Sequence, residues 1–229
     1  MNTIPVFMYR SSTHRAFAPR IFACSAALLL LFCMSGCGVL PKKENIQVVA
    51  PHIKIAPDAA WPMVNWQLSV ARPTANRMLD SNRIVVSPTP GALQVYKGAA
   101  WTDAAPDVLE RAVVEAFEDS GKIAAVGRQA TAVRADYLLL LDIRHYEAVY
   151  ATAAASPSAI IEINAKLIDT TGHVAATRTF SQSTPASGTA VPAVAQAFDT
   201  ALTALTGELI GWTLTAGQQA QAAAKTPKK

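Results

Sequence analysis

The chain has 229 residues, a formal net charge of +4 and 51% hydrophobic residues. This apolar content excludes intrinsic disorder of the whole chain, and the length suits one domain with additional tails. No stretch reaches the ~20 consecutive apolar residues that a helix needs to cross a bilayer, which excludes a multi-span membrane protein.

Residues 1–36 have the pattern of a secretory signal peptide. Arg10, Arg15 and Arg20 occur without any acidic residue, and an uncharged apolar block follows from Ile21 to Met34. Ser35 and Gly36 are the small residues expected before a cleavage site. The sequence Met-Ser-Gly-Cys37 resembles the lipobox of bacterial lipoproteins, in which the cysteine thiol is diacylated and the cysteine becomes an acylated N-terminus. The alternative is a plain signal peptide or short membrane anchor, with Cys37 an incidental thiol.

Lipidation at Cys37 predicts a protein that stays attached to a membrane, because two or three acyl chains anchor firmly where one does not. The residue after the cysteine is Gly38, not the aspartate that retains lipoproteins in the inner membrane under the enterobacterial sorting rule. We therefore expect the outer membrane, with the protein on its periplasmic face.

Cleavage before Cys37 changes the charge and the cysteine content. Removing residues 1–36 leaves 193 residues, and it lowers the net charge from +4 to +1 because three arginines and no acid are lost. No basic stripe with interleaved aromatic residues remains, which argues against nucleic acid as a partner. Cys24 and Cys33 are also removed, so the mature chain is expected to form no internal disulfide.

The chain divides by composition into four parts. Residues 1–36 are the signal peptide, 37–64 a lipidated tether and proline-rich irregular segment, 65–214 a folded domain, and 215–229 a disordered Ala/Gln/Lys tail. Within the domain, two segments have helical periodicity: one runs from Pro106 to Gly121, and the other follows Thr189 and ends near Trp212.

The strands of the domain are predicted from alternating or β-branched segments. The first strand is expected to begin near Asn65. The further strands are expected to cover 83–86, 93–96, 123–126, 137–150, 161–167 and 173–181. The last three read as an antiparallel meander. The element order predicts an α+β fold: a mixed, largely antiparallel sheet with two helices packed on one face.

No catalytic or metal-binding motif is present in the sequence. His52, His145 and His173 are far apart, without metal-ligand spacing, and no nucleophile elbow, phosphate-binding loop or zinc-protease motif occurs. We predict a protein that is not an enzyme and that has no metal or cofactor. A Ser/His/Asp site assembled from distant residues remains open at this point.

Charged and aromatic side chains suggest two candidate surfaces. The acids Asp136, Asp142, Glu147 and Glu162 alternate along predicted strands with Arg134, Arg144 and Lys166, as cross-strand charge pairs on an exposed sheet face would. Tyr96, Trp101, Tyr146 and Tyr150 are candidates for a partner interface. The alternative, given equal weight, is that these aromatic residues cover the edge of the core.

Several segments together resemble the auxiliary lipoproteins of ABC-type transport systems, the group that includes the paraquat-inducible C lipoprotein. They are Leu68-Ser-Val-Ala-Arg-Pro-Thr-Ala, Leu79-Asp-Ser-Asn-Arg-Ile-Val-Val, Leu93-Gln-Val-Tyr with Trp101, Val108-Leu-Glu-Arg-Ala-Val-Val-Glu-Ala-Phe with Ser120-Gly121, Ala135-Asp-Tyr-Leu, Ala165-Lys-Leu-Ile-Asp, Phe180, and Trp212-Thr213. Their order and spacing carry the resemblance, which spans residues 68–213.

The resemblance implies an accessory subunit of a phospholipid-type transporter that contains MCE-domain proteins and an ABC transporter complex. It also implies homo-oligomeric rings at the outer-membrane end of the MCE tube. We therefore predict a non-enzymatic outer-membrane lipoprotein that docks the MCE subunit of an intermembrane lipid transport system. The alternative is an envelope-assembly lipoprotein that serves lipopolysaccharide export, a secretin or peptidoglycan synthases.

Overall fold

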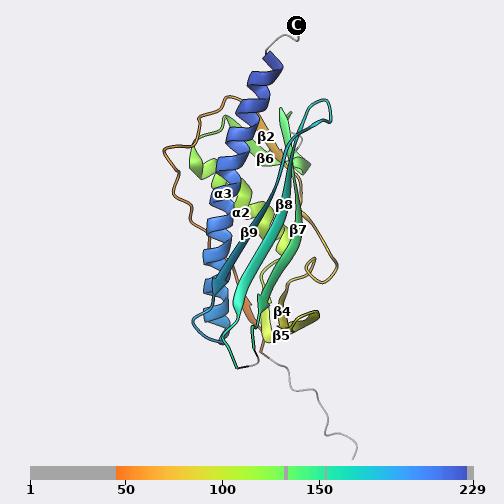
Figure 1. Cartoon of the computed structure of the whole chain (residues 1–229), viewed down its shortest axis with the longest axis vertical. Coiled ribbons are helices and arrows are strands. Elements are labelled where there is room, and N and C mark those ends of the chain that lie inside the picture. The colour runs from red at the N-terminus through yellow and green to blue at the C-terminus, as the bar shows by residue number, and fades with distance from the viewer. Residues whose placement is uncertain (1–44, 132–133, 153, 226–229) are drawn as a thin grey trace, which may run out of the picture. The chain divides into compact units, whose positions relative to one another are not determined.

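The computed structural model describes residues 45–131, 134–152 and 154–225 (Figure 1). The predicted signal peptide and Cys37 lie outside the described residues. No helix within the described ranges has both the length and the apolar character needed to cross a membrane.

The long strand β7 (Tyr137–Val149) organises a nine-stranded mixed sheet. One edge of β7 pairs antiparallel with β8 (Ser158–Asp169), which pairs antiparallel with β9 (Val174–Pro185). The three short strands β2 (Gln67–Val70), β3 (Thr74–Ala75) and β4 (Arg83–Thr89) follow one another along its other edge, all parallel to it. The predicted meander is confirmed.

The remaining strands extend the sheet beyond β2 and β4. β6 (Ala125–Arg128) pairs parallel with β2. β5 (Ala92–Trp101) forms an antiparallel hairpin with β4, and β1 (Gln47–Val49) pairs parallel with β5. The long ladders are antiparallel and the parallel ones are short, which confirms the mixed, largely antiparallel sheet.

Helix α2 (Ala105–Ser120) begins and ends where its local sequence predicts. Pro106 lies in the first turn, where its missing N–H leaves no hydrogen bond unmade. Gly121 takes a left-handed conformation with φ of 60°, and its N–H donates to the Glu118 carbonyl. A 3-10 turn at Gln129–Thr131 follows β6.

Helix α3 (Val191–Lys225) is longer than its sequence predicts. The prediction of a disordered tail from residue 215 is wrong for residues 215–225, which continue the helix. The reason is packing: Gly217 lies against the Trp66 ring, while Ala216 and Ala220 contact the core. These contacts order a segment whose own sequence has no strong apolar periodicity.

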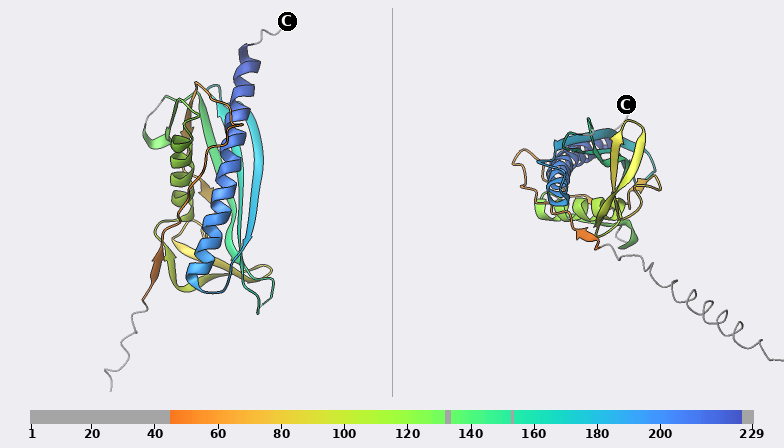
Figure 2. Two further views of the ribbon diagram at one scale, coloured as in Figure 1. Left: turned by 90° about the vertical axis from the view of Figure 1, so that its left-hand side faces the viewer. Right: turned by 90° about the horizontal axis from the view of Figure 1, so that it is seen from below.

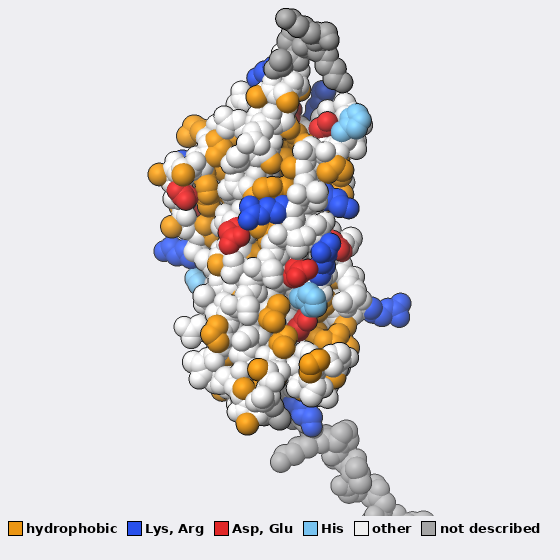
Figure 3. Space-filling model, in the orientation of Figure 1, with side chains coloured by type: hydrophobic (Ala, Val, Ile, Leu, Met, Phe, Trp, Pro, Cys, Tyr) orange, Lys and Arg blue, Asp and Glu red, His pale blue; other side chains and the backbone are white. Residues whose placement is uncertain are grey.

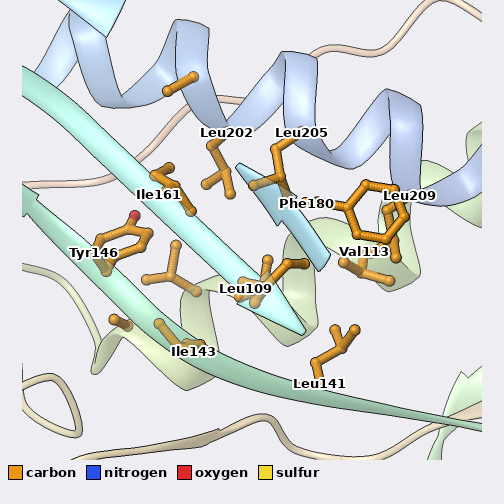
Figure 4. Close-up of a cluster of buried hydrophobic side chains, with 14 of the residues drawn as sticks. Leu109, Val113, Leu141, Ile143, Tyr146, Ile161, Phe180, Leu202, Leu205 and Leu209 are labelled. Atoms are coloured by element: carbon orange, nitrogen blue, oxygen red, sulfur yellow. The ribbon is translucent and has the colours of Figure 1, made fainter. Parts of the chain in front are cut away.

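Both helices cover the same face of the sheet (Figure 2). The core lies between them and the strands, and Figure 4 shows side chains of α2, α3, β7, β8 and β9 meeting there. Its labelled members are Leu109, Val113, Leu141, Ile143, Tyr146, Ile161, Phe180, Leu202, Leu205 and Leu209.

The segment before β2 is more ordered than the prediction of an irregular stretch over 37–64 suggests. It contains β1, and Ile53, Ile55 and Trp61 pack against the core. The backbone N–H of His52 also donates to Asp199 on α3, at 3.0 Å. Non-local contacts with β5 and α3 therefore hold this proline-rich segment on the domain.

Candidate docking surface

Two of the four aromatic residues predicted as a partner interface belong to the core. Trp101 and Tyr146 are each 1% exposed. Both pack on Phe198 of α3, with ring centroids 5.1 Å apart in each case. The interface prediction is wrong for these two residues, because a partner cannot reach them while the domain is folded.

Tyr96 and Tyr150 lie at the surface and are only partly buried. The Tyr96 hydroxyl donates to the carbonyl of Thr189, just before α3, and so ties β5 to the start of that helix. Burial, together with the neighbouring Tyr150 hydroxyl, raises the pKa of Tyr96 to about 12. The phenol therefore keeps its proton, and with it this hydrogen bond, at neutral pH.

The face of β7 and β8 that the helices leave uncovered carries charged side chains in cross-strand positions. Arg144 and Glu162 form an ion pair of 3.5 Å between the two strands. The predicted charge pairs on an exposed sheet face are confirmed at this position. Asp142 lies on the same face, where the Thr74 hydroxyl donates to it at 2.7 Å.

Two other acids of the predicted set have different roles. Asp136 accepts the backbone N–H of Gln67 at 2.8 Å, which fixes β2 beside the start of β7. Glu147 is only 7% exposed; it contacts the His145 ring at 2.7 Å and accepts the backbone N–H of Tyr146. These two carboxylates hold the backbone in place and do not offer a free charge to a partner.

A groove of about 380 Å³ runs over this open face. Its lining brings together strands that are distant in sequence: Arg72, Thr74, Leu140, Leu141, Asp142, Arg144, Asn164 and Lys166. Three cations and one acid lie around Leu140 on the open face, whereas the Leu141 side chain is in the core. Because Arg144 is paired with Glu162 and Arg72 with two carboxylates, the charges of this surface are mixed in sign.

Arg72 is held in the groove wall by two carboxylates. Its guanidinium bonds Asp107 in the first turn of α2 at 2.6 Å and Asp80 at 2.7 Å. The hydrogen bond from Arg72 holds the pKa of Asp107 below its ordinary value. Sequence reasoning missed Arg72, because the link depends on three segments that only the fold brings together.

The three histidines of the described ranges do not converge. His52 uses its backbone N–H on Asp199, the His145 ring contacts Glu147, and the His173 ring contacts the Thr171 hydroxyl. Within the described ranges, no group of three or more His, Cys, Asp or Glu side chains is placed to hold a metal ion.

The fold is an α+β domain with one helix-covered and one open sheet face. Over residues 48–209 the chain matches the model of the ABC-type transport auxiliary lipoprotein component family, and it belongs to that family. This confirms the predicted resemblance. The family is an auxiliary transport lipoprotein family and not a known enzyme family; membership implies a membrane lipid anchor.

Two solved structures and one sequence relative are similar to this chain. The protein XCC0632 from Xanthomonas campestris is 52% identical with a TM-score of 0.74, covering 77% of this chain and 99% of that one. An uncharacterized protein at 11% identity shares the fold alone, with a TM-score of 0.57 over 73% of this chain and 99% of its own. An uncharacterized protein of Bradyrhizobium diazoefficiens is 29% identical over 80% of this chain. The chain spans about half (48%) of that relative's length.

Proposed function

We propose that this protein is a non-enzymatic outer-membrane lipoprotein, anchored at Cys37, that docks the MCE subunit of an ABC-type intermembrane phospholipid transport system. Family membership supports the transport role. One observation carries the docking role: the helices fill one face of the sheet, and the grooved face of β7 and β8 stays open. The assembly would include several copies of the chain around the MCE subunit.

The open face suits a specific and reversible protein contact. Its charges are mixed in sign, and complementary charges across an interface set orientation and partner choice more than raw affinity. Among the residues that the structure describes, β9 pairs only with β8. Its other edge offers backbone hydrogen-bonding groups to which an extended segment of a partner could add as a further strand.

A photo-crosslinking amino acid placed at Asn164 tests this role. Asn164 lines the groove, and a matched probe at Glu118 lies on the exposed side of α2. In cells that express the transport system, we expect the probe at Asn164 to crosslink to the MCE-domain protein far more than the probe at Glu118. Equal yields from both, or capture of an envelope-assembly machine in place of the MCE protein, would contradict the proposal.

The anchor is tested separately. Cys37→Ala should release the protein from the membrane fraction, and density separation of the membranes carrying the unaltered chain should place it with the outer membrane. Retention of the Cys37→Ala protein in the pellet would show that the apolar block before it is the anchor. Recovery of the unaltered protein with the inner membrane would contradict the assigned location.

A further inference from the structure

We propose that the end of the domain that carries β1 and the β4–β5 hairpin rests on the lipid bilayer to which Cys37 is attached. The contact surface, which we call the anchor-end patch, consists of Ile46, Val48, Leu93 and Val95. The inference goes beyond the docking role and takes from the proposed function only the anchor at Cys37.

Exposed apolar side chains are concentrated at this end. Seven large hydrophobic residues are exposed in the part of the chain that the structure describes, and four of them form the anchor-end patch. Ile46 is 58% exposed, Val48 61%, Leu93 45% and Val95 38%. Large apolar side chains exposed together at one end of a domain favour a contact there with a partner or a membrane.

These residues are spread along β5 at one end of the domain: β1 pairs with the C-terminal residues of β5, and Leu93 and Val95 lie nearer the β4–β5 turn. Val48 is in register with Ala100 on the strand that also carries Leu93 and Val95. Figure 2 shows β1 and the β4–β5 hairpin at the same lower end of the domain. Hydrophobic side chains appear at the surface of this end in the space-filling view (Figure 3).

The charges at this end favour an anionic surface. Residues 45–49 and 83–102 contain Arg83 and Lys97 and no Asp or Glu; Glu44 and Asp103 border these ranges in the sequence, and Asp103 is paired with Arg111 at 2.8 Å. The carboxylate that β7 brings beside β4 belongs to Glu147, which is buried and hydrogen-bonded by the Tyr146 N–H. Asp199 of α3 accepts the His52 backbone N–H. Basic residues beside an apolar patch attract anionic lipid headgroups, and exposed carboxylates would repel them.

The length of chain before the domain decides which end can face the bilayer. Eight peptide steps separate Cys37 from Asn45, so that segment spans at most about 28 Å when fully extended. The far end of the sheet is the turn between Asp169 and Val174, and β8 alone, from Ser158 to Asp169, is roughly 36 Å long at ~3.3 Å a residue. A tether that joins the domain beside β1 is too short to let the far end rest on the membrane instead.

The occupant of the anchor-end patch is therefore a bilayer surface with anionic headgroups. The anchor keeps this end near lipid at all times, so the patch needs little affinity of its own. Its role is to fix the tilt of the domain and to hold the open face of β7 and β8 at a constant angle to the membrane.

Fluorescence quenching in vesicles tests the orientation. The lipidated full-length mature protein, carrying Leu93→Cys or Val48→Cys labelled with NBD, is reconstituted into phosphatidylethanolamine/phosphatidylglycerol vesicles that contain spin-labelled lipid. The label is site-specific because Cys37 is the only other cysteine of the mature chain and its thiol is acylated. Val174→Cys is the matched control, since Val174 is an apolar residue, 54% exposed, at the far end of the sheet.

We expect the labels at positions 48 and 93 to shift to the blue and to be quenched several-fold more strongly than the label at position 174. All three sites are exposed, and far-UV circular dichroism is recorded for each variant to check that it is folded. Equal quenching at the three positions overturns the proposal. A blue shift without quenching by lipid also overturns it, because a second copy or another protein then covers the patch.

The experiment separates this inference from the proposed function. If the protein stays with the vesicles and the labels at 48 and 93 are not quenched, the result supports attachment through Cys37 and contradicts only the proposed orientation of the domain. If the unlabelled protein does not stay with the vesicles, the anchor at Cys37 fails, and the orientation fails with it.

Discussion

The contact between Gly217 and Trp66 offers a sharp test of how α3 is held. An alanine Cβ at position 217 would lie 2.5 Å from Cζ2 and 2.9 Å from Cε2 of the Trp66 ring. These distances are shorter than real Cβ contacts, so either the ring or the helix must move. Trp66 is buried and packs edge-to-face on Tyr137 at 5.1 Å, and the Tyr137 hydroxyl donates to the Gly217 carbonyl at 3.1 Å. The ring has little space into which to move.

Two opposite effects determine how much Gly217→Ala changes the free energy of unfolding. Replacing glycine by alanine inside a helix ordinarily stabilises a protein by about 0.5–1 kcal/mol. Overpacking a filled core costs about 1–3 kcal/mol. Gly207 lies in the same helix and has open space at its Cβ position, so Gly207→Ala carries the first effect alone. We therefore expect Gly217→Ala to be less stable than Gly207→Ala by about 1–3 kcal/mol.

Urea unfolding of the two single variants and the unaltered protein, followed by circular dichroism, measures these free energies. A further pair of proteins, Trp66→Leu with and without Gly217→Ala, tests whether the Trp66 ring is the cause. In a Trp66→Leu background the clash is absent, so Gly217→Ala should recover a gain of about 0.5–1 kcal/mol. If Gly217→Ala is as stable as Gly207→Ala, or if its cost is unchanged in the Trp66→Leu background, the packing explanation for the end of α3 is wrong.

Three further predictions follow from the contacts of the surface and the core. Arg72→Ala should raise the pKa of Asp107, measured by NMR titration, and should cost up to about 1 kcal/mol at neutral pH because the ion pair is exposed. That loss should disappear as the pH falls through the lowered pKa of Asp107, since a carboxyl whose folded pKa is depressed stabilises only when it is ionised; a pH-independent loss would contradict this account. Tyr96→Phe removes the hydrogen bond to the Thr189 carbonyl and should lower the free energy of unfolding by about 0.5–1.5 kcal/mol. An unchanged thermal unfolding temperature would show that this hydrogen bond does not stabilise the fold. Trp101→Ala should destabilise the fold by about 3–5 kcal/mol. A variant that keeps its stability and loses only partner binding would instead show that Trp101 belongs to the interface.

Elements with strong local signals were predicted well from the sequence. Pro106 and Gly121 mark the ends of α2 because first-turn proline and left-handed glycine act within a few residues. The alternating pattern of β8 and the polar turn before β9 likewise predict their pairing. Such features depend on backbone conformation and on which side chains share a face, and both are written in neighbouring residues.

The candidate surface was harder to predict because it depends on burial. Sequence alone left Trp101 and Tyr146 undecided between interface and core, and the structure places both in the core against Phe198. The charge pair between Arg144 and Glu162 was predictable in kind, since both lie on the polar side of alternating strands. Arg72 was not, because its partners Asp80 and Asp107 come from segments that have no sequence relation to it.

The sequence by itself determined the lipobox at Cys37 as a candidate anchor, the α+β class, the ends of α2 and the family resemblance, because each depends on local order and spacing. Only the tertiary structure decided that α3 continues to Lys225, that one face of the sheet stays open, and that exposed apolar residues of β1 and β5 share one end. The physical reason is common to all three. Packing between residues distant in the chain fixes which backbone is ordered and which side chains remain exposed.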